Sequence, residues 1–462
     1  MLLSMQKSAL LLFSIFFSSI ISSQSLTTKL SSAFQTFEKD AQLKSGIASL
    51  YVVNAKTGAV VYKKNEMIGL APASTQKIIT SASAYELLGK DFYYKTKFGV
   101  VRGKDGYQLS IQPSGDPTLG SWRWESTKEV NAMNRIVAAV RKTGAEKLGP
   151  VIVYNKGWEG ENIPNGWIWE DIGNYYGAGA EALNWRENQY DLILKSGANI
   201  VDPVEIVGTK PFLYGYSLSS QLESAAKGTG DNAYIYFPLN GGSGSVRGTI
   251  PVNEKNFIIS GALPDAHNQF IETLRDSLKA SGNKPGGQNA LFLNNGDIEN
   301  VIHTETSPPL DSIIYWFNKK SINLYGEALV KTIGFQKNGK GNTKKGVDLI
   351  KDFWKGKGIA ETELNMVDGS GLSPLNRVTT HAQVHVLQHA KKQSWYNGFY
   401  YALPEYNGMK MKSGTIQGAK GFCGYHKSKS GEEYIFSFLV NNYNGSASGL
   451  VQKMYKVLDV LK

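Results

Sequence analysis

Three short motifs in this sequence combine residue types that can do nucleophilic chemistry. Residues 74–77 read S-T-Q-K, residues 321–323 read S-I-N and residues 412–415 read K-S-G-T. In this order they fit the patterns SxxK, SxN and K-[ST]-G, which supply a serine hydroxyl, two lysine amines and an amide side chain. The set predicts an enzyme that attacks an amide carbonyl with a serine and moves protons with lysine instead of histidine.

The first motif offers the nucleophile and its base. Ser74 and Lys77 stand three positions apart on a predicted helix that Pro72 introduces, so both side chains project from one face. A serine hydroxyl is a weak nucleophile until a base takes its proton. Burial and a nearby second cation both favour a neutral lysine, so Lys77 is the predicted base. At the helix start, the N–H of Ser74 is predicted to stabilise an oxyanion.

The second motif follows a helical pattern over residues 311–320. The Ser321 hydroxyl is predicted to relay a proton towards the leaving amine, between Lys77 and Lys412. Asn323 is expected to hydrogen-bond the substrate peptide or to hold Lys77. Both residues are therefore predicted to be catalytic.

The third motif lies in a predicted strand. Lys412 supplies positive charge for a substrate carboxylate, and Ser413 and Thr415 supply hydroxyls. The N–H of Thr415 is the second predicted oxyanion donor. Gly414 lacks a side chain, which would let a substrate lie along the strand edge. We predict that Lys412 is catalytic and that Ser413, Gly414 and Thr415 bind substrate.

The elements that must position these motifs come from both ends of the chain. An amphipathic helix is predicted over residues 29–43, and a hairpin of two strands over 47–53 and 59–64. Near the C-terminus, strands are predicted over 409–416, 421–426 and 434–441, and a helix over 449–462. We expect these strands to form one antiparallel sheet flanked by the terminal helices.

Composition fits a globular protein with more than one domain. The 462 residues are 41% hydrophobic and 19% charged, and the formal net charge is +11. The basic balance suits an anionic polymer, but no dense run of lysine and arginine points to nucleic acid, which is not an expected partner. Cys423 is the only cysteine, which excludes an intramolecular disulfide and a multi-cysteine metal site.

The N-terminus has the pattern of a signal peptide. Lys7 precedes an apolar run over residues 9–21, which is too short to span a bilayer, and small residues follow it. We predict cleavage near Ser23, so that residues 1–23 are the signal peptide. No later stretch reaches the ~18 apolar residues of a spanning helix. The expected location is therefore across the inner membrane, in the periplasm or associated with the cell envelope.

About half of the chain separates Lys77 from Ser321. A structureless loop of that length is not expected in a compact domain. We therefore predict a catalytic domain made of residues 24–95 and 301–462, and an inserted region, residues 96–300, that forms two nested β-rich domains.

The sequence resembles a known family beyond the three motifs. It is similar to the DacB-type D-alanyl-D-alanine carboxypeptidases/endopeptidases, the class C low-molecular-mass penicillin-binding proteins. The further resemblance lies in five segments: S-G-D-P-T-L at 114–119, G-W-I-W-E-D at 166–171, Y-Y-G-A at 175–178, A-L-N at 182–184 and D-G-S-G-L-S at 368–373. The long insert after the first motif is itself a mark of this family.

The resemblance implies an α+β fold and a specific activity. The expected fold is a serine penicillin-recognising (β-lactamase/transpeptidase-like) domain with an antiparallel sheet flanked by helices, plus β-rich inserted domains. The expected function is a serine DD-carboxypeptidase/DD-endopeptidase that acts on peptidoglycan stem peptides ending in D-Ala-D-Ala. β-Lactam antibiotics are expected to act as covalent inhibitors, and neither a metal nor an organic cofactor is expected.

Two positions depart from the family pattern. Ser413 stands where the third motif usually has threonine, and Pro374 stands where relatives can place an arginine that binds the stem-peptide side chain. We hypothesise that the 166–171 segment compensates, with Glu170 and Asp171 facing the ammonium group of that side chain. Trp167 in the same segment and Leu372 in the D-G-S-G-L-S segment are also predicted to bind substrate.

Two alternative functions and one alternative site fit the sequence less well. A β-lactamase would need a deacylating glutamate, and none is obvious near the motifs. An inactive peptidoglycan-binding module would not need the intact serine, lysines and asparagine. His381, His385 and His389 follow one another at helical spacing and could hold zinc, but no HExxH pattern accompanies them. We therefore expect an ordinary helix face.

Overall fold

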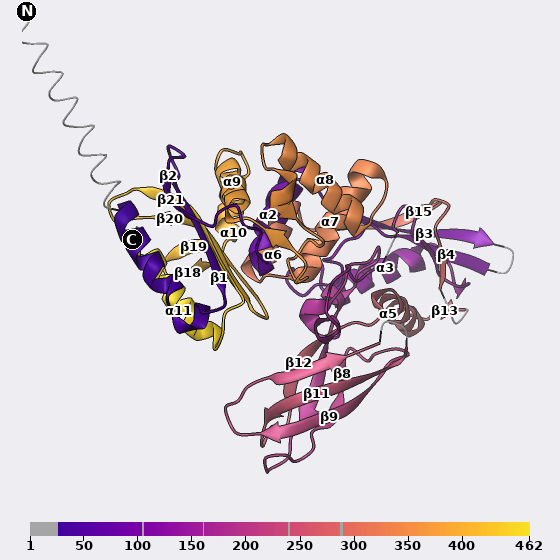
Figure 1. The fold of residues 1–462 in the computed structure, drawn as a ribbon. Helices are drawn as coiled ribbons and strands as arrows, with labels where there is room; N and C mark the ends of the chain where they lie inside the picture. Colours follow the sequence, from indigo (N-terminus) through magenta and orange to yellow (C-terminus); the bar gives the residue numbers. More distant parts are fainter. Residues whose placement is uncertain (1–25, 104–105, 160, 239–240, 287–289) are drawn as a thin grey trace, which may run out of the picture. The chain divides into compact units, whose positions relative to one another are not determined.

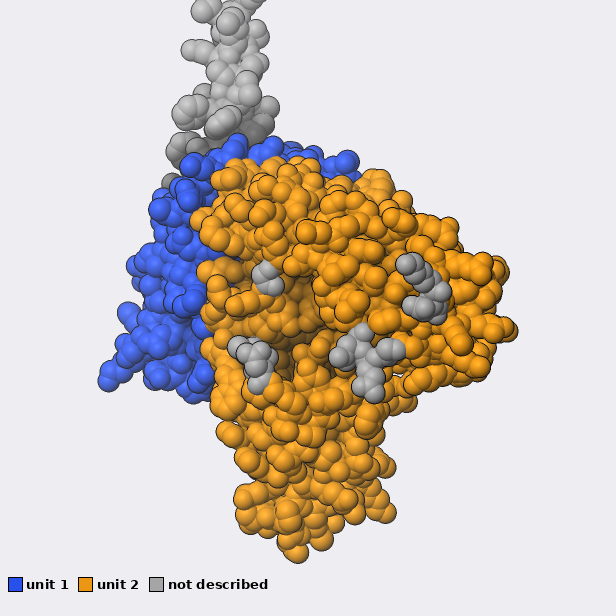
Figure 2. All heavy atoms as spheres, turned by 90° about the vertical axis from the view of Figure 1, so that its right-hand side faces the viewer, with its two compact units in different colours: residues 1–82, 354–366, 374–462 blue, residues 83–353, 367–373 orange. Residues whose placement is uncertain are grey.

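The computed structural model describes residues 26–103, 106–159, 161–238, 241–286 and 290–462 (Figure 1). The predicted signal peptide, residues 1–23, lies outside this described part. None of the helices formed by the described residues is both long enough and apolar enough to cross a membrane. The chain divides into two compact units (Figure 2): unit 1 comprises residues 1–82, 354–366 and 374–462, and unit 2 comprises residues 83–353 and 367–373.

Unit 1 is built on a six-stranded sheet in the order β18-β19-β20-β21-β1-β2. All neighbouring strands pair antiparallel. The strands are β1 (Ile47–Asn54), β2 (Val60–Lys64), β18 (Glu405–Tyr406), β19 (Met409–Ile416), β20 (Ala419–Lys427) and β21 (Glu433–Asn441). The predicted hairpin, the three predicted C-terminal strands and their union in one antiparallel sheet are confirmed.

The central strand β21 is buried along almost its whole length because both of its faces are covered. Its alternate residues point to opposite faces. Phe436 and Phe438 face a core shared with the helix at residues 26–38 and with α11 (Ala447–Leu458), where Phe37 packs 5.2 Å from Phe438 between ring centroids. Ser437 points the other way and donates a hydrogen bond to Gln383 of α9 (Thr380–Lys391). Helices therefore cover both faces of this sheet.

Short elements complete unit 1. They are η1 (Ala41–Leu43), η2 (Ala73–Gln76), η5 (Glu361–Glu363), α10 (Tyr396–Ala402), η6 (Asp459–Leu461) and the two-stranded sheet of β16 (Leu364–Asn365) and β17 (Arg377–Val378). The helices α2 (Lys77–Leu88) and α8 (Thr343–Gly356) each continue from one unit into the other.

Unit 2 contains a seven-stranded sheet with helices α3 (Glu129–Lys142) and α5 (Ala266–Ala280). Its strands are β3 (Lys95–Gly103), β4 (Gly106–Gln112), β5 (Lys147–Leu148), β6 (Ile152–Tyr154), β13 (Lys284–Pro285), β14 (Leu291–Leu293) and β15 (Val301–Thr306). The sheet and both helices share one apolar core, to which Phe98, Ile136 and Phe270 contribute fully buried side chains.

A second core in unit 2 lies among two three-stranded sheets. One sheet has the order β12-β7-β8 and the other β10-β11-β9. The strands are β7 (Gln189–Lys195), β8 (Glu205–Lys210), β9 (Ser217–Ala225), β10 (Asn232–Tyr236), β11 (Ser243–Pro251) and β12 (Phe257–Ala262). Leu192 and Leu194 of β7 meet Ile235 and Val246 of the other sheet in this core.

The remaining helices of unit 2 are α4 (Trp169–Ile172), η3 (Tyr175–Gly177), η4 (Arg186–Asn188), α6 (Leu310–Lys319) and α7 (Asn323–Asn338). The first three turns of α7 are buried on all sides, which fixes the segment that joins it to α6. The α+β class, with an antiparallel sheet flanked by helices, is confirmed. The boundaries proposed for the inserted region, 96–300, stay a prediction.

Candidate active site

Ser74 lies in a 3-10 turn, not in the α-helix that the sequence suggested. Residues Ala73–Gln76 form η2, and α2 begins at Lys77. In a 3-10 turn, side chains three positions apart eclipse one another, so Ser74 and Lys77 lie one above the other. The Nζ atom of Lys77, whose side chain is fully buried, stands 2.9 Å from Ser74 Oγ in a hydrogen bond. The candidate nucleophile and its candidate base are therefore in direct contact.

The third motif lies in β19, as predicted, and β19 packs beside η2 in unit 1. Lys412 is 1% exposed, and its Nζ donates to the carbonyl oxygen of Ser413 at 2.8 Å. Burial lowers the pKa of Lys412 to about 7, although the neighbouring Cys423 opposes the shift and the cation of Lys420 adds to it. A lysine with a pKa near neutrality can exchange protons at physiological pH.

Gly414 brings β19 against the backbone that carries Ser74. A Cβ atom at this position would lie 2.6 Å from Pro72 O, 2.9 Å from Ser74 N and 2.8 Å from Thr75 N. No side chain fits there, so the glycine is required for this close approach of strand and turn. The other expected reason, room for a substrate along the strand edge, stays a prediction beside this packing reason.

The second motif lies in unit 2, between α6 and α7. Ser321 has φ = 57°, a left-handed conformation that is uncommon for residues other than glycine. Asn323 is the first residue of α7, and its Nδ2 donates to the carbonyl oxygen of Tyr176 at 2.7 Å. The structure brings Ser74, Lys77 and the third motif together within unit 1. The approach of Ser321 and Asn323 to them stays a prediction.

The aromatic segment and the D-G-S-G-L-S segment meet in unit 2. Trp167 is 8% exposed and donates from Nε1 to Asp368 Oδ2 at 2.9 Å. The same oxygen accepts the N–H of Ser373 at 2.7 Å, and the other carboxylate oxygen accepts the N–H of Gly371 at 2.8 Å. Asp368 therefore holds this turn, in which Leu372 is also 8% exposed, against Trp167.

The two acidic residues of the aromatic segment lie in the short helix α4. Glu170 is exposed and Asp171 is half-buried. Burial, and to a smaller degree the charge of Glu170, raises the pKa of Asp171 to about 6. Both carboxylates stand in the first turn of α4, and their binding to a substrate stays a prediction.

Comparison with known families decides the assignment. Residues 30–459 match the family described as D-Ala-D-Ala carboxypeptidase 3 (S13). The chain belongs to the S13 family. It is therefore a serine-type peptidase of the D-Ala-D-Ala carboxypeptidase class, and the recognised resemblance is confirmed.

Two curated relatives match this S13 peptidase over most of its length. A D-alanyl-D-alanine carboxypeptidase from an Actinomadura species is 25% identical over 460 residues, which cover 92% of this chain and 83% of the relative. The D-alanyl-D-alanine carboxypeptidase DacB of Haemophilus influenzae is 21% identical over 417 residues, which cover 85% of this chain and 84% of the relative.

A solved structure supports the fold of the S13 peptidase. Penicillin binding protein 4 (dacB) from Haemophilus influenzae superposes with a TM-score of 0.78 at 19% identity, covering 95% of this chain and 98% of that chain. Its complex with a β-lactam gives a TM-score of 0.73 at 18% identity, covering 94% and 99% of the two chains. The expected serine penicillin-recognising fold is confirmed.

Lys420 of the S13 peptidase is a candidate site residue that the sequence analysis missed. The turn after Ile416 is short, so β19 and β20 pair with Thr415 opposite Lys420. Lys420 Nζ donates to Thr415 Oγ1 at 2.6 Å and stands 5.2 Å from the centroid of the Phe422 ring. Burial lowers the pKa of Lys420. The sequence held one signal for this contact. Gln417 and Gly418 form a two-residue hairpin loop between β19 and β20, and such a loop fixes the register of the two strands.

The three histidines of α9 in the S13 peptidase each contact a neighbour of their own. His381 Nδ1 is 2.8 Å from Glu363 Oε2, and His385 Nε2 is 2.9 Å from the carbonyl oxygen of Lys357. His389 packs edge-on against Trp354 with ring centroids 5.3 Å apart. Each histidine is thus held by a different neighbour, and the expectation of an ordinary helix face stays a prediction.

Proposed function

We propose that this S13 peptidase removes the terminal D-Ala from peptidoglycan stem peptides through an acyl-enzyme on Ser74. One observation carries the proposal: the buried Lys77 amine contacts the Ser74 hydroxyl at 2.9 Å, beside the strand that holds the third motif. In its neutral form Lys77 accepts the hydroxyl proton while Ser74 Oγ bonds to the carbonyl carbon of the penultimate D-Ala.

Collapse of the tetrahedral intermediate breaks the amide C–N bond. The leaving amine needs a proton, and we assign its delivery to Ser321, which relays it from Lys77 or Lys412. Asn323 would orient the peptide or Lys77. Water then attacks the acyl carbon and gives a proton to the neutral lysine base. The base returns this proton to Ser74 Oγ as the C–O bond of the acyl-enzyme breaks, which releases the shortened peptide and regenerates the serine.

The developing oxyanion needs two N–H donors aimed at one point. We assign these to Ser74 and Thr415, because Gly414 holds β19 so close to η2 that their backbones adjoin. Ser413 and Thr415 lie on one face of β19, since alternate residues share a face. Their hydroxyls would bind the terminal carboxylate of the substrate, and Gly414 would leave the approach to Ser74 open.

The same site would react with β-lactams and with cross-bridges. The Haemophilus influenzae relative has been solved in complex with a β-lactam, and we expect β-lactams to acylate Ser74 of this chain. A D-Ala–diaminopimelate bond presents the same acyl group, so an endopeptidase reaction is included. The proposed setting is the periplasm or cell envelope, reached with the help of the signal peptide at residues 1–23.

A labelled penicillin tests the proposed function against its two alternatives. A stable adduct on the full chain supports the DD-peptidase. Rapid turnover of the label would indicate a β-lactamase, and absence of any reaction would indicate an inactive peptidoglycan-binding module. Release of D-Ala from a D-Ala-D-Ala peptide is the matching activity assay.

We further propose that Trp167, Glu170, Asp171 and Leu372 contact the stem-peptide side chain. The Glu170→Gln/Asp171→Asn double variant should lower kcat/KM for a diaminopimelate peptide about tenfold, the effect of losing ~1.4 kcal/mol. Acylation by a simple penicillin, which lacks the ammonium group, should stay unchanged. The control Glu223→Gln, an exposed acid of the same unit, should alter neither reaction.

The pH dependence gives this prediction a second readout. The pKa of Asp171 is raised to about 6, so the carboxyl group is ionised above that pH and neutral below it. Preference for a peptide with a side-chain ammonium over one without it should therefore be present at neutral pH and decline as the pH falls through about 6. An equal loss on both substrates in the double variant would show that the acids are structural.

Lys420 is proposed to bind the terminal carboxylate together with Thr415. Replacing it in Lys420→Met should lower kcat/KM about tenfold for peptides with a free C-terminal carboxylate, because an ionic hydrogen bond of ~1.5 kcal/mol is lost. The loss should be small for the same peptide capped as an amide. The exposed Lys427 of the same strand supplies the control, Lys427→Met. Equal losses on the two peptides would contradict carboxylate binding.

A further inference from the structure

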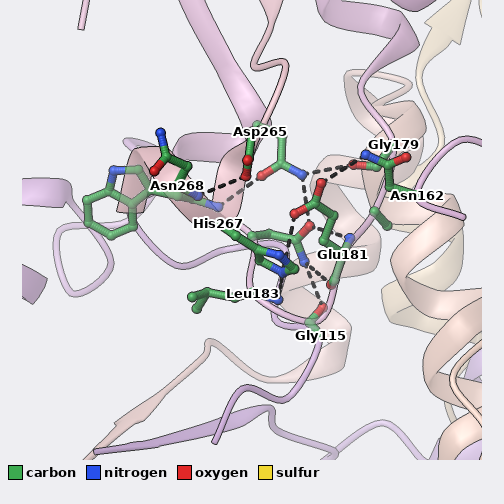
Figure 3. Close-up of polar contacts among 12 residues, drawn as sticks. Gly115, Asn162, Gly179, Glu181, Leu183, Asp265, His267 and Asn268 are labelled. Carbon is green, nitrogen blue, oxygen red and sulfur yellow. Dashed lines mark hydrogen bonds and ion pairs between the residues drawn. The ribbon is translucent and has the colours of Figure 1, made fainter. Parts of the chain in front are cut away.

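One cluster of metal-ligating side chains lies in unit 2, among the residues that the structure describes. Glu181, Asp265 and His267 each offer a ligand atom, and these atoms all lie within 4.8 Å of one another (Figure 3). Glu181 comes from the segment between η3 and η4, whereas Asp265 caps α5 and His267 lies in its first turn. None of the three belongs to the motifs of the proposed peptidase site.

The contacts of His267 leave two hydrogen-bond acceptors facing each other. The N–H of Leu183 donates to His267 Nε2 at 3.1 Å, so this nitrogen carries the lone pair. The same nitrogen is 3.2 Å from Glu181 Oε2 and cannot donate to it in that tautomer. Glu181 Oε2 is buried and has no hydrogen-bond donor. A cation is the species that satisfies a carboxylate oxygen and an imidazole lone pair at once.

Neighbouring groups fix the other ligand atoms. Asn162 Nδ2 donates to Glu181 Oε1 at 2.9 Å, which leaves Oε2 turned towards His267. Asp265 Oδ1 accepts the N–H of Asn268 at 2.8 Å as the cap of α5 and leaves its second oxygen for a ligand. The His267 ring stacks on Phe292 with centroids 5.3 Å apart. Such supporting contacts are what orient metal ligands in proteins.

A cavity of about 320 Å³ adjoins the cluster, with Glu181 and His267 in its wall. Two further wall residues, Asn155 and Trp158, have buried polar atoms, Oδ1 and Nε1, that lack a hydrogen-bond partner. Buried polar atoms are nearly always paired with protein groups or ordered water. The cavity therefore has both the room and the polar partners for water bound to an ion.

We infer that Glu181, Asp265 and His267 bind one divalent transition-metal ion of the zinc class. One imidazole and two carboxylates form a three-residue ligand set of the kind that leaves a fourth position to water, and imidazole disfavours Mg²⁺ and Ca²⁺. Binding at Nε2 would replace the hydrogen bond from the Leu183 N–H by a metal–nitrogen bond. The ion would link the start of α5 to the segment that contains Glu181. This inference differs from the sequence-based expectation that the protein needs no metal.

Zinc binding by the full, tag-free chain tests the site. After treatment with EDTA and addition of Zn²⁺, we expect one equivalent to remain through gel filtration and the melting temperature to rise. Co²⁺ should give visible absorption bands, and Mg²⁺ and Ca²⁺ should not compete. Glu181→Gln, Asp265→Asn and His267→Ala should each lose the retained ion. Asn162→Ala should weaken binding roughly 10- to 100-fold, the usual effect of removing a supporting contact.

The control is His385→Ala, which removes a histidine of the α9 series and should keep one equivalent. Loss of zinc in this variant, or retention in the Glu181, Asp265 and His267 variants, would overturn the inference, as would a wild-type chain that retains no ion. Circular dichroism of Glu181→Gln and Asp265→Asn, which keep the size of the side chain, shows whether a loss of zinc comes from misfolding. Penicillin labelling is a separate readout, so a failure of the proposed peptidase function leaves the zinc result interpretable.

Discussion

Replacing Ser74 by alanine is expected to abolish D-Ala release and penicillin labelling, with a loss of more than about 10⁴-fold in rate. The variant removes the hydroxyl oxygen that lies 2.9 Å from Lys77 Nζ and that is proposed to form the acyl bond. The fold should survive because only one half-buried hydroxyl is deleted. Labelling kinetics and a thermal melt measure the two effects.

The position of the adduct makes the Ser74 prediction specific. Mass spectrometry of the penicillin-treated wild type should find the label on the peptide that contains Ser74. The matched control is Ser430→Ala, an exposed serine of the same unit, which should label normally. An adduct on any other serine would overturn the assignment of the nucleophile.

The Lys77→Ala variant is expected to slow acylation by about 10² to 10⁴-fold, the usual range for loss of a general base. Binding should weaken far less, because Lys77 acts on Ser74 and is fully buried. Pre-steady-state labelling separates the acylation rate from the binding constant. Deleting a buried side chain also leaves a cavity, so the melting temperature must be measured in parallel.

A near-normal acylation rate in Lys77→Ala would exclude Lys77 as the base. Lys412 would then be the next candidate, since its pKa is lowered to about 7 by burial. Lys410 lies on the same strand and is only partly buried, so Lys410→Ala is a matched control that should acylate at the normal rate.

Features of this protein that depend on short-range spacing could be predicted from the sequence. The three-residue interval from Ser74 to Lys77 was enough to predict that the two side chains project from one face. The two β-rich runs at 47–53 and 59–64, with the residues N-A-K-T-G between them, were enough to predict the first hairpin. Local patterns work here because side-chain direction repeats regularly along a helix or a strand. The family followed from the same motifs and from their order in the chain.

Features that depend on contacts between distant segments could not be predicted from the sequence. Only the packing of β19 on η2 gives the reason for Gly414, and only the strand register puts Lys420 against Thr415. Likewise, Glu181 and His267 are far apart in sequence, and no spacing rule joins them. Such contacts depend on how buried surfaces fit together. The close packing of side chains in the interior is set by the whole fold and not by neighbours along the chain.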